Sequence, residues 1–204
     1  MQFNQDITFL TDGGDTVRKL TEYLNPNAEH VLDWFHVTMR LTQMGQVAKG
    51  LPSDLEGLSL DQVARRLESI KWKVWHGDAD GAIERVEQLE FELDVFLDDE
   101  GVDRAPQPVR KLLKLLREFA TYIQLNQAYI PQLRRPLSHG ELISSAVAES
   151  TVNQVISKRM CKQQQMRWTP AGAHRLLQLR VRVLDGELFN TFKGWYPAMK
   201  DQIG

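Results

Sequence analysis

The spacing of apolar positions predicts a short mixed segment at the start of the chain. Two β-prone runs, residues 7–10 and 29–33, flank an amphipathic helical stretch at residues 15–23. A helix between two strands is typical of a βαβ unit, in which the strands run parallel. Helical spacing returns at residues 37–47, where a second such unit would begin.

Longer helical stretches follow. Apolar residues recur at intervals of three and four along residues 60–74, 82–96 and 109–123, with short breakers between them. This pattern predicts three antiparallel helices. Three more helices are expected toward the end of the chain, at residues 142–160, 170–184 and 187–192. The predicted fold class is therefore α/β and mostly helical.

Composition adds limits on class and location. The chain has 204 residues, of which 42% are hydrophobic and 25% charged, as in ordinary soluble domains. No run approaches the roughly 18 apolar residues of a membrane span, and the first residues lack the features of a secretory signal. The single cysteine, Cys161, excludes an internal disulfide and a cysteine-based zinc site. We therefore expect a cytoplasmic protein with no membrane partner.

Charged residues are segregated along the chain. Residues 78–103 are strongly acidic and contain one basic residue, Arg85, whereas Lys and Arg outnumber Asp185 and Glu187 in residues 158–200. Such segregation can mark a surface that binds polyanions. A solvated acidic hairpin beside a solvated basic helix explains the same pattern, because exposed charge is the norm on protein surfaces.

Three carboxylates stand out by position. Asp12 and Asp33 each end a predicted strand, and Glu149 lies among small residues on a predicted helix that could approach the sheet closely. Carboxylates gathered in this way can hold two divalent ions, about 3.5–4 Å apart, for phosphodiester chemistry. Each residue also has a simpler explanation: a turn residue at Asp12, a helix cap at Asp33 and a surface residue at Glu149.

Other side chains suggest supporting roles. His36 follows Asp33 by three residues and could hydrogen-bond to it or brace a site, although an isolated histidine at a helix start is more often structural. Trp72 and Trp75 are interleaved with lysines, a pattern that suits base stacking with phosphate contact. Packing of both tryptophans in a helical core explains the same pattern.

Five sequence blocks resemble the carboxy-terminal part of bacterial insertion-sequence transposases of the DDE type, in particular the ISKra-type family. They keep their order over nearly the whole chain and read FLTDGGDTVR, AEHVLDWFHVTMRLT, LESIKWKVWHGD, AVAESTVNQVISKRMCKQQQMRWTPAGAHRLLQLRVRVL and FNTFKGWYP. The resemblance implies a partial ribonuclease H-like core interrupted by an all-helical insertion. Residues 1–49 would belong to the core, residues 50–140 would form the insertion, and residues 141–204 would supply the last core helices.

The resemblance also assigns roles to the carboxylates. Carried over by position, Asp12 is the second catalytic acid and Glu149 the third, and both would bind metal in a two-ion site holding Mg²⁺ or Mn²⁺. Asp33 and His36 match a supporting motif, [Cys/Asp]-x-x-His, that follows the second acid in related families. They would brace the site and would stay outside the catalytic triad.

The implied partner is DNA, both transposon ends and target. In some relatives a tryptophan of the insertion stabilises DNA, which makes Trp72 or Trp75 a candidate. Phosphate contacts are expected from basic residues of the third segment, namely Lys158, Arg159, Lys162 and Arg167. A homo-oligomer or a full-length transposase is a further expected partner, in the bacterial cytoplasm near the nucleoid.

The chain departs from the family at its start. The first catalytic acid belongs on a strand that would precede Met1, and the usual DNA-binding region is missing as well. We therefore expect the chain alone to be a poor or inactive strand-transfer enzyme. Two other functions stay open: a non-catalytic DNA-binding or oligomerising fragment that modulates the full-length transposase, and a generic helical interaction domain.

Overall fold

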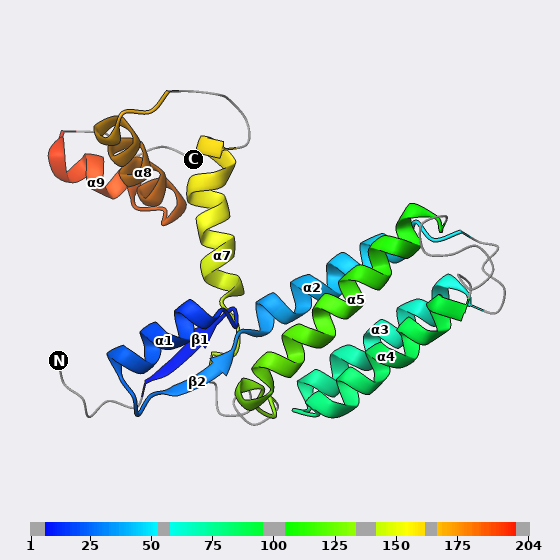
Figure 1. Cartoon of the computed structure of the whole chain (residues 1–204). Helices are drawn as coiled ribbons and strands as arrows, with labels where there is room; N and C mark the ends of the chain where they lie inside the picture. Colours follow the sequence, from blue (N-terminus) through cyan, green and yellow to red (C-terminus); the bar gives the residue numbers. More distant parts are fainter. Residues whose placement is uncertain (1–6, 53–57, 96–104, 134–141, 162–166, 199–204) are drawn as a thin grey trace. The chain divides into compact units, whose positions relative to one another are not determined.

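The computed structural model describes residues 7–52, 58–95, 105–133, 142–161 and 167–198 (Figure 1). The chain divides into two compact units, residues 1–145 and residues 146–204, and each is described by itself. Both are built mainly from helices, and the first also holds a small parallel sheet. The α/β, mostly helical class predicted from the sequence is confirmed.

The first unit begins with a β–α–β segment. Strands β1 (Thr8–Thr11) and β2 (Glu29–Leu32) pair in parallel, with Thr8 opposite Glu29 and Thr11 opposite Leu32. Helix α1 (Asp15–Leu24) connects them. It ends at Asn25, whose extended backbone cannot continue a helix and whose side chain accepts a hydrogen bond from the Asn27 N–H. That turn leads the chain directly into β2.

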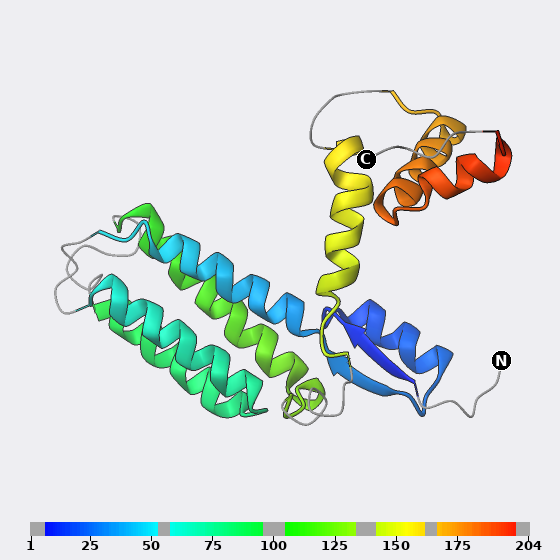
Figure 2. The same cartoon turned by 180° about the vertical axis from the view of Figure 1, so that it is seen from behind.

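Four helices form a bundle after the sheet: α2 (Trp34–Ala48), α3 (Leu60–Trp75), α4 (Ala79–Val95) and α5 (Gln107–Asn126). Helix α2 lies along α5 and α3 along α4 in both views (Figures 1 and 2). Helix α3 starts with a capping box, in which Ser59 and Gln62 satisfy each other's backbone N–H groups.

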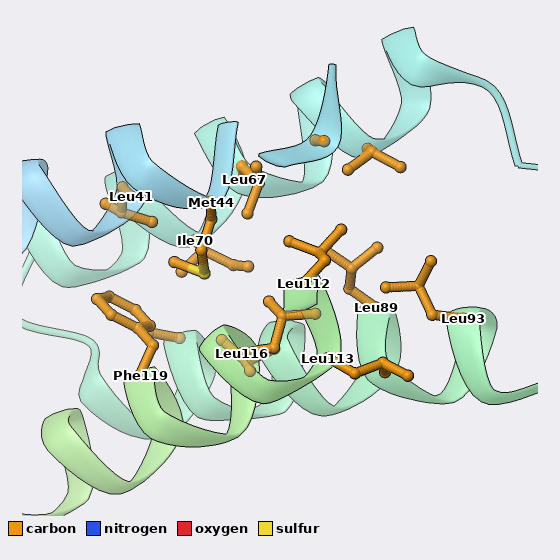
Figure 3. Packing of buried hydrophobic residues seen from close by; sticks show 14 of the residues in the cluster. Leu41, Met44, Leu67, Ile70, Leu89, Leu93, Leu112, Leu113, Leu116 and Phe119 are labelled. Atoms are coloured by element: carbon orange, nitrogen blue, oxygen red, sulfur yellow. The ribbon is translucent and has the colours of Figure 1, made fainter. Parts of the chain in front are cut away.

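The bundle interior is apolar and closely filled (Figure 3). Each helix turns one stripe of residues inward at intervals of three and four, as the sequence predicted. The labelled core residues are Leu41, Met44, Leu67, Ile70, Leu89, Leu93, Leu112, Leu113, Leu116 and Phe119. Burying one such leucine contributes about 1.5–3 kcal/mol, so this core is the main stabilising element of the first unit.

Helix α2 differs from the sequence-based expectation in its start. It begins at Trp34, three residues before the expected start at residue 37, because the Asp33 side chain caps it by accepting a hydrogen bond from the Phe35 N–H. It also packs against both α3 and α5. The helix expected to open a second βαβ unit is therefore a member of the bundle.

The second unit contains α7 (Ala146–Val152), the π-helix η2 (Asn153–Cys161), α8 (Pro170–Leu184) and α9 (Leu188–Trp195). The single helix expected at residues 142–160 instead starts at Ala146 and widens into the π-helix. Thr169 caps α8 by accepting from the Gly172 N–H, as the Thr-Pro signal predicted. No described residue of this unit is fully buried.

Arg180 ties the parts of the second unit together. Its guanidinium donates to the carbonyl oxygens of Val155 and Gln154, at 2.9 and 2.6 Å, and so joins α8 to η2. Carbonyl groups are freed where an α-helix widens, so an arginine is a suitable partner for them. Across the described residues, no helix is both long and apolar enough to cross a membrane.

Candidate acidic site

Two carboxylates leave the same edge of the sheet. Thr11 and Leu32 are paired at the ends of β1 and β2, so Asp12 and Asp33 follow at equivalent positions on neighbouring strands. The Asp33 N–H donates to the Thr11 carbonyl at 2.8 Å and extends the pairing by one step. We call Asp12 and Asp33 the acidic edge. Carboxyl ends of parallel strands are a common place for α/β proteins to build a site.

Asp33 is buried and fully engaged. It is 2% exposed and accepts hydrogen bonds from the backbone N–H groups of Phe35 and Ser145, at 2.9 and 3.0 Å. The Ser145 hydroxyl donates to its second oxygen at 2.5 Å. The cap suggested from the sequence is therefore real, and Asp33 also fixes a segment 112 residues away.

His36 makes a looser contact with Asp33 than the motif suggested. Its Nε2 lies 3.7 Å from the Asp33 carboxylate, which is too long for a hydrogen bond, although a protonated ring would form an ion pair. The side chain is 27% exposed. Ser145, which no sequence motif singled out, makes the close contacts with Asp33.

Asp12 is the open member of the acidic edge. Its side chain is exposed, and one oxygen accepts a hydrogen bond from the Gly14 N–H at 3.0 Å. This closes a turn of the Asx type, which confirms the turn role suggested from the sequence. Because the carboxylate stays accessible and keeps lone pairs unused by that bond, Asp12 can contact a ligand while Asp33 supports the backbone.

The end of α5 reaches the acidic edge from the bundle. Asn126 is 2% exposed, and its amide lies against Gly13, the residue after Asp12. Its Nδ2 donates to the Tyr122 carbonyl at 2.8 Å, while Oδ1 has no hydrogen-bond partner among the described residues. Sequence reasoning missed Asn126. The available signal was a polar residue seven positions after Phe119, on the apolar stripe of α5.

Tyr122 lies one turn before Asn126 and is also buried. Burial raises the pKa of Tyr122 to about 12, and the Asp12 and Asp33 charges act in the same direction. The Arg40 guanidinium, which lies 4.1 Å from the centre of the Tyr122 ring, opposes the shift. The phenol is therefore neutral at physiological pH and sits within the electrostatic field of the acidic edge.

The acidic edge alone does not make a two-ion site. Among the described residues, no three His, Cys, Asp or Glu side chains come together closely enough to hold a metal ion. Asp33 uses its oxygens for hydrogen bonds, which leaves Asp12 as the accessible oxygen ligand of this edge. Glu149 is exposed on α7, in the second unit. Its sharing of an ion with Asp12 stays a prediction.

The two candidate tryptophans differ in their surroundings. Trp75 is half-buried and packs edge-on against Trp34, with 5.0 Å between ring centres, which favours the packing alternative. Trp72 is 48% exposed, and the Lys71 ammonium lies 5.3 Å from its ring centre. Lys71 is also paired with Glu68, at 2.9 Å. An accessible ring can stack on nucleic-acid bases, so Trp72 is the more accessible of the two candidates.

The candidate phosphate contacts lie in the second unit. Lys158 is exposed on η2 and Arg167 is exposed just before α8. The Arg159 side chain and all of Lys162 lie outside the described residues.

Comparison with known proteins adds no relative. No protein-family model, curated protein or solved structure matches the chain.

Proposed function

We propose that the chain is part of the catalytic core of a DDE transposase, with Asp12 and Glu149 as two of its three catalytic acids. The observation that carries the proposal is the division of roles at the acidic edge. Asp12 is exposed, whereas Asp33 is buried and engaged by three donors. The resemblance assigns these same roles, a metal-binding acid and a supporting acid, to these two positions.

The bundle supports the proposal in a second way. Helices α3, α4 and α5 lie between Asp12 and Glu149 in the chain, where related transposases carry a helical insertion. The exposed Trp72 on α3 then gives the insertion an aromatic face for DNA. A ribonuclease H-like topology is part of this proposal.

The chemistry expected of the site follows from its residues. In a two-ion site, the bound ions activate one oxygen and stabilise another during phosphodiester cleavage. Asp12 would contribute a hard oxygen ligand on a turn held by the Gly14 N–H. Asp33 would keep the end of β2, the start of α2 and the Ser145 backbone in register.

Proximity of the two proposed acids is the decisive test. We would replace Asp12 and Glu149 together by cysteine in a Cys161→Ser background and treat the full chain with a short thiol-to-thiol crosslinker. Efficient intramolecular crosslinking is expected. The matched control pairs Asp12→Cys with Val147→Cys, because residues two apart on an α-helix face different sides. Equal crosslinking of both pairs, or none of the first pair, would refute the proposal.

A second function, DNA binding without catalysis, is favoured by the surface of the second unit. Helices α8 and α9 line a groove that combines basic and aromatic side chains, among them Arg175, Arg182, Phe192 and Trp195. Aromatic rings beside cations suit single-stranded nucleic acid. Salt-dependent DNA binding that persists in the double variant Asp12→Ala, Glu149→Ala, without metal-dependent cleavage by the parent chain, would support this alternative.

A further inference from the structure

The last turn of α5 holds the turn that carries Asp12. Gly13 has a φ of +86°, a conformation that side chains disfavour, and a Cβ added there would lie 2.7 Å from Oδ1 and 2.8 Å from Nδ2 of Asn126. The Asn126 amide therefore fills the space that the missing Gly13 side chain leaves. A side chain at residue 13 would therefore have to displace the Asn126 amide.

Asn126 is itself held in place. It is 2% exposed, and its Nδ2 donates to the Tyr122 carbonyl within the same helix. The amide plane therefore takes its orientation from α5, and α5 is fixed by the bundle core through residues such as Phe119. A rigid helix thus presents one side of the Asn126 amide to the Asp12–Gly14 turn.

A second contact joins the same two segments. Arg18 of α1 donates from Nη1 to the Leu125 carbonyl at 3.1 Å, and its guanidinium lies 5.5 Å from the centre of the Tyr129 ring. The Gly14 carbonyl, in turn, accepts from the Arg18 N–H in the first turn of α1. The end of α5 is therefore attached to the turn at two adjacent residues, at Gly13 directly and at Gly14 through α1.

We infer that Asn126 is a positioning residue for Asp12: its amide, packed against Gly13, sets the turn in which the Asp12 carboxylate accepts from the Gly14 N–H. The catalytic meaning of this rests on the proposed function, in which Asp12 binds metal. In structural terms, the helical bundle as well as strand β1 determines the direction of the Asp12 carboxylate.

The test measures the rigidity of the turn in the folded full-length chain. Backbone ¹⁵N relaxation gives order parameters for the Gly13 and Gly14 amides. We expect values near 0.85 in the parent chain and below about 0.6 in Asn126→Ala, because the alanine leaves the space beside Gly13 empty. The control is Gln124→Ala, an exposed position on the same helix turn, which should leave both amides rigid.

A conservative variant separates positioning from general stability. Leucine branches at the same atom as asparagine, so Asn126→Leu should keep the space filled and the order parameters close to those of the parent. Rigid Gly13 and Gly14 amides in Asn126→Ala would overturn the inference, as would a turn that loosens equally in Asn126→Leu or in Gln124→Ala. The measurement uses neither metal nor DNA. The positioning role therefore stands or falls independently of the crosslinking result.

Discussion

Replacing Gly13 by alanine probes the contact on which the turn depends. The added methyl group would meet Oδ1 of Asn126 at 2.7 Å, well inside ordinary van der Waals contact, and the φ of +86° is itself unfavourable for alanine. The variant therefore suffers two separate penalties. One belongs to the backbone of Gly13, and the other requires the Asn126 side chain.

The magnitude of each penalty can be worked from the structure. Alanine in the left-handed region costs about 1–2 kcal/mol, partly offset by about 0.4–1 kcal/mol from the less flexible unfolded chain. Displacing the Asn126 amide breaks its hydrogen bond to the Tyr122 carbonyl and leaves a buried donor unpaired, which costs about 1–3 kcal/mol. We expect Gly13→Ala to lower the free energy of unfolding by about 1–4.6 kcal/mol in total.

The assay is a double-mutant cycle in which far-ultraviolet circular dichroism monitors the urea unfolding of each variant. In the Asn126→Ala background the methyl group no longer meets an amide, so Gly13→Ala should cost about 1 kcal/mol there. Gly45→Ala is the control. Gly45 lies inside α2 with nothing within 4 Å of an added Cβ, so the same substitution should stabilise the protein by about 0.5–1 kcal/mol.

The cycle has a clear refuting outcome. If Gly13→Ala destabilises the parent chain and the Asn126→Ala chain equally, the cost comes from the Gly13 backbone alone. The packing of Asn126 against Gly13 would then contribute nothing to the free energy of unfolding. A Gly13→Ala variant as stable as the parent would contradict both parts of the reasoning.

Two further predictions follow from the acidic edge and the strand pair. Asp33→Asn should lower the free energy of unfolding by about 2–3 kcal/mol in urea titrations, because an amide cannot accept from all three donors. Asp12 is exposed, so Asp12→Asn should change that free energy by less than about 0.5 kcal/mol. Equal effects of the two substitutions would contradict the division of roles. Burial, aided by the Arg18 charge and opposed by Glu22, holds the pKa of His30 below its usual 6.5. At a pH between the lowered pKa of the folded chain and the usual 6.5 of the unfolded chain, the unfolded chain binds a proton that the folded chain does not. Stability should therefore fall as the pH drops below 6.5, and His30→Gln should weaken that dependence. Thermal unfolding measured from about pH 7.5 to about pH 5 with the same slope in both proteins would exclude this role.

The elements of the fold were largely predictable because their signals are local. Short β-prone runs bounded by turn residues placed both strands within a residue of their observed bounds, and three-and-four spacing placed α3, α4 and α5. The start of α2 was predicted three residues too late, although a helix cap at Asp33 was one of the two roles that the sequence suggested for that residue. The widening of α7 into the π-helix was not predicted, and the sequence carries no strong local signal for it.

The roles within the site were less accessible to sequence reasoning because they depend on distant contacts. Asp12 and Asp33 look alike in sequence, each following a short β-prone run. What separates them is Ser145, 112 residues after Asp33, which supplies two of the three hydrogen bonds that occupy it. The position of Asn126 against Gly13 likewise requires knowledge of how α5 meets the sheet. The resemblance supplied the division of roles without this physical reason.

These contacts also explain how a sheet of two parallel strands persists. Parallel strands are normally covered on both faces, and a pair is marginal alone. Here the support comes from residues that follow α5 in the chain. The Tyr129 ring lies 4.6 Å from the His30 ring on β2, and the Ile143 carbonyl accepts a hydrogen bond from the Trp34 N–H, two residues after β2 ends. Tyr129 and Ile143 therefore support the strand pair from the same two segments, the end of α5 and the residues before α7, that supply Asn126 beside Gly13 and Ser145 on Asp33.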